Sequence, residues 1–167
     1  MIMLREFHLK KEVKYRLIKH ISFLENELKD YGMFKSLSWK EYNEERTKRR
    51  DVERWIENII NSSIDISKII LTSEEKAIPD TYKAIVKNLS LISGFSAENM
   101  EKLVEWVGLR NIISHEYLDV RWTSIKRFIS ETEPLYKHLL DNTKAYLEKK
   151  MADDKEQAQK RWTRQPF

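Results

Sequence analysis

The chain has 167 residues, a formal net charge of +4 and no cysteine. This length fits one domain with a sizeable core, and the lack of cysteine excludes disulfides and thiolate metal sites. A basic chain is compatible with a polyanionic partner, although many basic proteins bind none. Only three glycines and three prolines accompany 35% charged and 41% hydrophobic residues. Because this balance is typical of amphipathic helices, the composition predicts an all-α protein.

The chain shows no segment that would direct it to a membrane. Arg5, Glu6 and Lys10 lie too early for the apolar core of a signal peptide. No apolar run approaches the roughly 20 residues that span a bilayer. We therefore expect a cytoplasmic protein without a membrane partner.

Hydrophobic spacing predicts two helices in the first half of the chain. The first covers about residues 4–31, and Gly32 is expected to end it as a C-terminal stop. Ser38 and Glu41 form a capping-box pattern, so a second helix is expected to begin there. Its apolar stripe predicts that this helix is long and ends near Leu71.

A charged loop and a third helix are expected next. The loop covers residues 72–80, and Pro79 with Asp80 is expected to open a helix that runs through Leu91. Gly94 then closes this helix.

Two further helices complete a single domain, expected at residues 1–150. Ser96 is the expected N-cap of the fourth helix. The fifth begins after Asp119, and Pro134 is expected to kink or split it. The polar tail, residues 151–167, is expected to be frayed helix or disordered.

The stretch GLRNIISHEYLDV places polar residues on a surface that is otherwise apolar. On a wheel of about 100° per residue, Arg110, Ser114 and Tyr117 fall in the middle of a broad apolar arc. Asn111 and His115 lie at the edge of this arc. So broad an arc predicts that several neighbours cover the helix. The apolar residues of the arc are Leu103, Val104, Trp106, Val107, Leu109, Ile113 and Leu118.

A buried Arg110 requires an anionic partner, because its guanidinium stays charged. One interpretation is a structural salt bridge to an acid on another helix, such as Asp65 or Glu57. Tyr117 lies two turns after Arg110 and projects to the same side. His115 points about 140° away, so one straight helix does not aim both motif side chains at one atom. Either the arginine side chain wraps around, or a second chain completes the site.

The motif RNIISHEY resembles the RxxxxHxY signature of HEPN-domain toxins of the HepT family, usually encoded beside a minimal nucleotidyltransferase antitoxin, MntA. Residues 49–71 resemble the long helix of this family, with its Val-Glu-Arg start and Ile-Asp-Ile centre. IPDTYKAIVKNLSLISG resembles the segment that follows. The resemblance implies a HEPN bundle of about five helices that forms a homodimer, with the motifs of two chains in a shared cleft.

The resemblance also implies an activity, that of the toxin of a type VII (HEPN/MNT) toxin-antitoxin system. Such toxins are metal-independent endoribonucleases in which the ribose 2′-OH attacks the adjacent phosphorus of tRNA or mRNA. His115 is the expected proton-transfer residue and Arg110 the expected charge stabiliser, with Asn111 and Ser114 in support. No cofactor is expected, and the four histidines show no metal-ligand spacing.

Tyr117 has a second implied role in the resemblance. In the family, the motif tyrosine accepts AMP groups that MntA transfers from ATP, which inactivates the toxin. An adenylate would add negative charge and bulk two turns from Arg110. The alternative is that Tyr117 packs in the dimer interface.

Two basic segments and two other functions stay open as alternatives. The run ERTKRRDVER could steer RNA or form a solvated face, and the segment KRWTRQPF could stack on bases or be disordered. The chain could instead be a non-catalytic substrate-binding subunit of a nucleotidyltransferase complex. It could also be a helical interaction domain in which Arg110 only forms a salt bridge.

Overall fold

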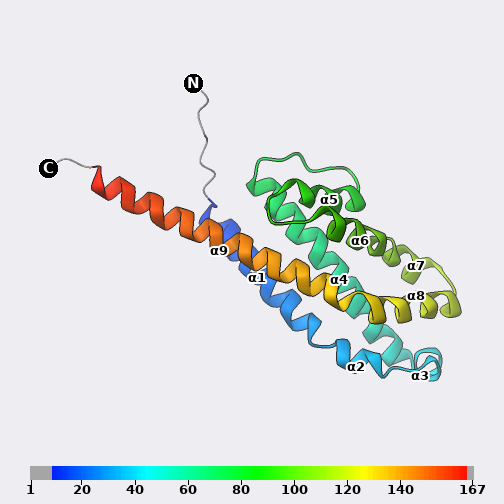
Figure 1. Cartoon of the computed structure of the whole chain (residues 1–167). Coiled ribbons are helices and arrows are strands. Elements are labelled where there is room, and N and C mark those ends of the chain that lie inside the picture. Colours follow the sequence, from blue (N-terminus) through cyan, green and yellow to red (C-terminus); the bar gives the residue numbers. More distant parts are fainter. Residues whose placement is uncertain (1–8, 165–167) are drawn as a thin grey trace.

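The structure, a computed structural model, describes residues 9–164, which form nine α-helices and one short 3₁₀ helix without any strand (Figure 1). The all-α prediction is confirmed. In chain order the helices are α1 (Lys11–Leu28), α2 (Tyr31–Lys35), α3 (Trp39–Glu44), α4 (Arg46–Ser73), α5 (Tyr82–Asn88), η1 (Leu89–Leu91), α6 (Ala97–Val107), α7 (Leu109–His115), α8 (Leu118–Glu131) and α9 (Glu133–Thr163).

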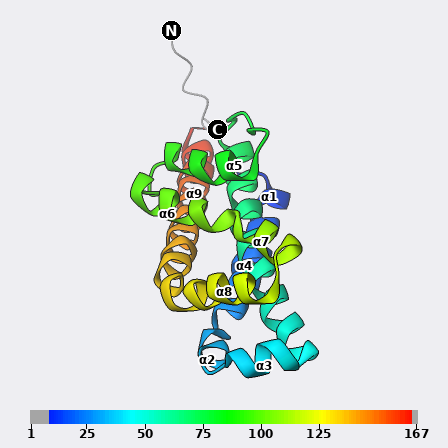
Figure 2. The same cartoon turned by 90° about the vertical axis from the view of Figure 1, so that its right-hand side faces the viewer.

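The long helix α4 lies at the centre of the bundle. It packs against α1, α3, α5, α7 and α9, and α1 also packs against α9 (Figure 1). Figure 2 shows α7 and α8 toward the viewer, with α2 and α3 at the lower end of the molecule. Burying one isoleucine side chain fully contributes about 1.5–3 kcal/mol of transfer free energy, so the buried isoleucines of α4 supply much of the stability of the core. The isoleucines of α4 that are fully buried are Ile56, Ile59, Ile60, Ile66 and Ile70.

The two helices predicted for the first half are each divided in two. Gly32 lies inside α2, so its prediction as a helix stop is wrong. The chain turns because Tyr31 is fully buried, where its hydroxyl lies 2.6 Å from Thr132 Oγ1. The capping box of Ser38 and Glu41 is confirmed, but the backbone turns extended at Glu45 and separates α3 from α4. Residues 4–8 of the predicted first helix lie outside the described residues.

The third helix starts later than predicted. Thr81 is its N-cap, because the Thr81 side chain accepts a hydrogen bond from the backbone N–H of Ala84 at 3.2 Å. Pro79 and Asp80 therefore belong to the preceding loop. The helix changes to a 3₁₀ turn that ends at Leu91, and Gly94 follows with a φ of +96°.

The fourth and fifth predicted helices are also divided. Ser96 is confirmed as an N-cap, since its Oγ accepts from the N–H of Asn99 at 3.1 Å. The fourth helix breaks at Gly108, between α6 and α7. The fifth begins at Leu118, one residue before Asp119, and splits just before Pro134, which lies in the first turn of α9.

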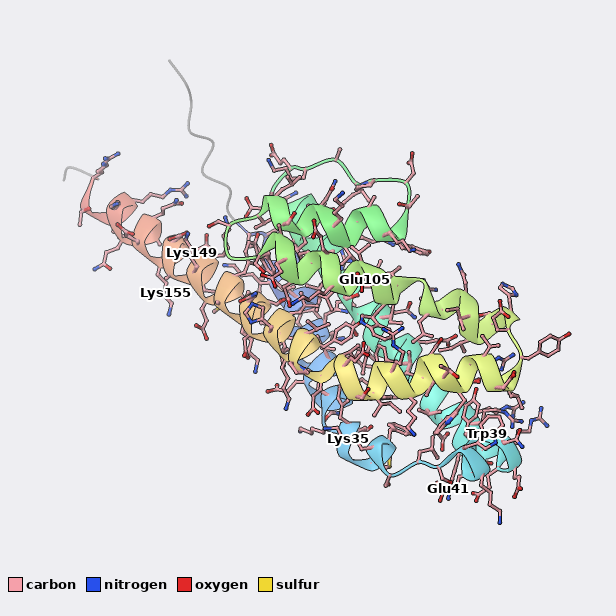
Figure 3. The ribbon with its side chains drawn as sticks, turned by 45° about the vertical axis from the view of Figure 1, so that its right-hand side comes forward. Lys35, Trp39, Glu41, Glu105, Lys149 and Lys155 are labelled. Atoms are coloured by element: carbon pink, nitrogen blue, oxygen red, sulfur yellow. The ribbon has the colours of Figure 1, made fainter. Side chains whose placement is uncertain are left out.

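The last helix extends well beyond the body of the bundle (Figure 1). The tail, expected to be frayed helix or disordered, continues α9 as far as Thr163. Lys149 and Lys155 lie on the second half of this helix (Figure 3), where Lys150 still pairs with Glu74 and Asp154 with Lys14. None of the helices within residues 9–164 is long and apolar enough to cross a membrane.

The turn between α7 and α8 is held by Arg121. Its Nε donates a hydrogen bond to the carbonyl of Glu116 at 2.7 Å, and its Nη1 donates to Glu53 Oε1 at 3.2 Å. The same carboxylate oxygen accepts from the hydroxyl of Tyr42 at 2.7 Å. Burial of Tyr42 and its hydrogen bond to Glu53 raise the pKa of the phenol, so it remains a donor at neutral pH. The turn is thereby tied to α3 and α4.

Replacing Arg121 by leucine should loosen this turn selectively. Both hydrogen bonds are lost, and we expect a free energy of unfolding lower by about 1–3 kcal/mol. Amide hydrogen exchange should also become faster at residues 116–118. Urea denaturation and exchange mass spectrometry measure the two effects, with Lys126→Leu, at an exposed position of the same helix, as control. Unchanged exchange in Arg121→Leu would mean that Arg121 does not hold the turn.

Glu74 joins the end of α4 to α9 in a way that depends on pH. Its Oε1 accepts from Tyr146 Oη at 2.7 Å and pairs with Lys150 Nζ at 2.9 Å. Burial alone would raise the pKa of Glu74, but the hydrogen bonds from Lys150 and Tyr146 outweigh it and lower the pKa below its ordinary value of 4.5. Because the folded pKa is depressed, the stabilisation is complete above the unfolded pKa and is lost as the pH falls through the folded pKa.

Glu74→Gln should therefore destabilise the protein at neutral pH more than in acid. We expect a loss of about 0.5–1.5 kcal/mol at pH 7, because one partly buried ion pair is removed. Denaturation midpoints measured from neutral pH to well below 4.5 should show that the difference in stability between parent and variant becomes smaller as the pH falls. Glu105→Gln, at an exposed position, is the control. A difference that stays constant with pH would contradict the assignment.

Candidate functional site

The RxxxxHxY stretch lies on the short helix α7 and on the turn that follows it. Gly108 separates α7 from α6, with a tight turn in which the N–H of Asn111 donates to the carbonyl of Gly108 at 3.1 Å. A wheel for one straight helix across residues 103–118 is therefore wrong, because the two helices are not continuous. The broad apolar arc belongs to two short helices that face different neighbours.

The polar residues of this stretch are much less buried than predicted. Helix α7 packs on α4 and α8, and its buried side chains are Leu109 and Ile113. Arg110 is half-buried, and Tyr117 is 84% exposed. The expectation that several neighbours cover the whole surface is thus wrong for the single chain. Asn111, Ser114 and His115 are exposed as well.

Arg110 has an aromatic partner in place of the predicted acid. Its guanidinium carbon lies 5.0 Å from the ring centroid of Tyr82, within the range of a cation-π contact. Among residues 9–164 it forms no salt bridge, so pairing with Asp65 or Glu57 is not observed. The Nζ of Lys68 also lies 5.2 Å from the Tyr82 ring centroid. One tyrosine therefore contacts two cations.

A cleft of about 430 Å³ opens between α5 and α7, a volume that suits a small organic ligand. Arg110 and Lys83 bring positive charge to it, and Glu57 is the one acid among the lining residues. The cleft therefore favours an anionic ligand, for which arginine offers a planar fork of donors. The lining residues are Glu57, Thr81, Tyr82, Lys83, Val107, Gly108, Arg110, Asn111 and Ser114.

The cleft brings together three of the five predicted site residues. Arg110, Asn111 and Ser114 line it, whereas His115 and Tyr117 do not. The hydroxyl of Ser114 donates to the carbonyl of Arg110 at 2.9 Å, so only its lone pairs remain for a ligand. No hydrogen bond to the imidazole of His115 is found within the described part of the chain. His115 ends α7, and Tyr117 follows it in the turn held by Arg121.

A second hollow of about 560 Å³ adjoins the cleft at Glu57, which lines both. Arg50 and Arg54 lie along it, together with Ile113. The basic residues at the start of α4 therefore have different surroundings. Arg50 and Arg54 face the hollow, whereas two others form ion pairs or hydrogen bonds with nearby residues. Lys48 pairs with Glu41 and Glu45, and Arg49 donates to the carbonyls of Tyr42 and Asn43.

Tyr82 and Lys83 are among the lining residues of the cleft that were not predicted as site residues. Tyr82 and Lys83 belong to the IPDTYK stretch, read from the sequence only as a landmark. The only sequence signal was an aromatic residue followed by a lysine beside a turn, and its distance from the motif in sequence gave no hint of the contact with Arg110.

At the other end of α7, helix α3, with Trp39 and Glu41, lies below the turn between α7 and α8 (Figure 3).

Comparisons with known proteins identify the family and the fold of the chain. The family model of HepT-like ribonucleases matches residues 12–142. No curated protein matches the chain. Among solved structures, the tri-AMPylated Shewanella oneidensis HEPN toxin in complex with MNT antitoxin superimposes with a TM-score of 0.67 at 19% identity, covering 77% of this chain and 96% of that one.

A second solved structure is similar to the same extent. It is a toxin-antitoxin with AMP-PNP, with a TM-score of 0.68 at 18% identity, and it covers 77% of this chain and 97% of its own. At such low identities these likenesses establish the fold, and the family model covers most of the chain. The chain therefore belongs to the HepT-like ribonuclease family and has the fold of the HEPN toxins.

Proposed function

We propose that this protein is the toxin of a HEPN/MNT toxin-antitoxin pair and acts as a metal-independent endoribonuclease. The observation that supports it best is the cleft in which Arg110, Asn111 and Ser114 meet, one turn before the exposed imidazole of His115. A phosphate in this cleft would meet the planar donor fork of Arg110. The match to the HepT-like ribonuclease family supports RNA as the substrate class.

The proposed reaction needs a base, an acid and positive charge at the phosphate. One imidazole of His115 takes the proton of the ribose 2′-OH, whose oxygen attacks the adjacent phosphorus. The bond from phosphorus to the 5′-oxygen breaks, and this oxygen receives a proton from a second imidazole. The products are a 2′,3′-cyclic phosphate and a 5′-OH end. Arg110 stabilises the charge that develops on the phosphoryl oxygens.

The exposure of His115 supports a homodimer as the active form. Within one chain the imidazole lies outside the cleft that Arg110 lines, and it is open to solvent. A second copy that approaches this end of α7 would place its own His115 beside the cleft. The two histidines would then act as base and acid, as the reaction requires.

Tyr117 is the proposed site of control by a nucleotidyltransferase. Its side chain is 84% exposed, and Arg121 fixes the turn that carries it. The phenol oxygen would attack the α-phosphorus of ATP, the phenol proton would pass to a base, and pyrophosphate would leave. The added AMP would bring negative charge and bulk to the end of α7, where substrate RNA would otherwise bind.

His115→Ala and Arg110→Ala should each reduce RNA cleavage in EDTA by at least about a hundredfold, because each removes one part of the catalytic apparatus. Cleavage of a labelled RNA, measured with circular dichroism and size-exclusion chromatography, separates loss of catalysis from loss of fold. His138→Ala, an exposed histidine on α9, is the matched control. If all variants cleave as well as the parent, His115 and Arg110 have no part in the reaction.

The same assay distinguishes the alternative of a non-catalytic subunit. That reading draws support from His115, which has no hydrogen-bond partner within residues 9–164 to orient it. It predicts a stable complex with the nucleotidyltransferase and no cleavage in EDTA by the unmodified parent. Cleavage that depends on His115 would exclude it.

Tyr117→Phe should abolish the transfer of AMP by the cognate nucleotidyltransferase, because the acceptor oxygen is missing. Intact mass after incubation with the partner and ATP measures the gain in steps of one AMP. Tyr15→Phe is the control, since Tyr15 is also exposed, at 58%, but lies on α1. Mass gain that persists in Tyr117→Phe would assign the modification to another residue.

A further inference from the structure

Tyr82 stands between cations at the mouth of the cleft and still exposes much of its ring. Arg110 and Lys68 lie 5.0 and 5.2 Å from the ring centroid, yet 49% of the side chain is exposed. A half-exposed ring beside a cationic cleft can contact a nucleobase or ribose while it holds Arg110 in place. The sequence motif alone assigns no function to this residue.

Lys83 adds a second cation to the same cleft. Its Nζ lies 3.5 Å from the point where a Cβ on Gly108 would stand, so the side chain crosses the break between α6 and α7. Within the described chain, Lys68, Lys83 and Arg110 form no salt bridge with any acid. Lysines elsewhere in the bundle, such as Lys48 and Lys150, do pair with carboxylates. The cleft thus holds two cations, Lys83 and Arg110, that no ion pair of the described chain neutralises, with Lys68 beside them at the ring of Tyr82 and Glu57 as the one acid of the lining.

The adjoining hollow adds two arginines along α4. Arg50 and Arg54 line it together with Glu53, which pairs with Arg121, and with Glu57, where the hollow meets the cleft. The two hollows, of about 430 and 560 Å³, lie in sequence between α5 and the start of α4. A groove with several cations and an exposed aromatic ring is the usual form of a site for single-stranded nucleic acid.

We propose that the cleft between α5 and α7 binds one nucleotide of single-stranded RNA, the one next to the scissile phosphate, through Tyr82 and Lys83. Lys83 contacts its phosphate beside Arg110, and the ring of Tyr82 contacts its base or ribose. Arg54 and Arg50 contact the phosphates that follow. The identity of the ligand rests on the proposed function, whereas the roles of Tyr82 and Lys83 rest on the cleft itself.

Binding, rather than cleavage, tests this site. Fluorescence anisotropy of a labelled 12-nucleotide single-stranded RNA is measured with the His115→Ala protein, so that no RNA is cut. Adding Tyr82→Leu should weaken binding by about tenfold, the scale of one lost contact between a base and an aromatic ring. Tyr82→Phe keeps the ring and should retain most of the binding. Adding Lys83→Ala should reduce the slope of log Kd against log salt by about 0.7, for one lost phosphate contact.

Two matched controls separate this site from general charge and exposure. Tyr15 is exposed and also has a lysine over its ring, with Lys19 Nζ at 4.7 Å, but it lies on α1. Lys87 is exposed one turn after Lys83 on α5 and does not line the cleft. Tyr15→Leu and Lys87→Ala should leave RNA binding within about twofold of the parent.

Each outcome decides the proposal. Selective weakening by the changes at Tyr82 and Lys83 supports it, and it does so even if the His115-intact protein fails to cleave RNA. In that case the nuclease function falls and the binding site stands. Equal binding by all variants, equal weakening by the controls, or no RNA binding by the parent would overturn the site. The first two of these results would leave the nuclease assay on His115 and Arg110 unaffected.

Discussion

The burial of α4 is the constraint on which the rest of the molecule depends. One face of this helix is a continuous run of fully buried isoleucines, against which α1, α5 and α9 pack. Its other face remains accessible and carries Arg50, Glu53, Arg54 and Glu57. A helix held so firmly on one side gives the opposite side a defined position. The cleft beside α7 therefore lies against a helix that is anchored in the core, which suits a catalytic or binding surface.

Local sequence patterns predicted most of the helical segments and the break at Pro134, but not the other breaks. Ser38 and Ser96 were correctly identified as N-caps, because a cap is a contact within four residues of chain. The turn before Tyr31 could not be predicted, since it arises from the buried contact with Thr132, 101 residues away. Breaks decided by tertiary packing leave no local signal, and Gly32 was misread for this reason.

The candidate site, too, could be predicted only where it depends on neighbouring residues in the sequence. The composition of the motif pointed to Arg110 and His115, and both lie on one helix as expected. The neighbour of Arg110 could not be predicted, because Tyr82 lies on a different helix and pairs through its ring instead of a carboxylate. The prediction of an acidic partner did not consider an aromatic one. An aromatic face can stabilise a half-buried guanidinium while the positive charge stays available to a ligand.

The two ends of α7 are held by separate contacts, and this separation bears on the proposed control through Tyr117. At the first end, Arg110 rests on Tyr82 of α5, and at the other Arg121 ties the turn to Glu53 of α4. The proposed modification of Tyr117 would therefore act at a turn that is fixed independently of the cleft. It need not deform the cleft to exert its effect, because a charged, bulky group there would obstruct the approach of RNA or of a second chain. Under the proposed function, inhibition by obstruction would leave the fold and the cations of the cleft in place, so removal of the group would restore a site that is already assembled.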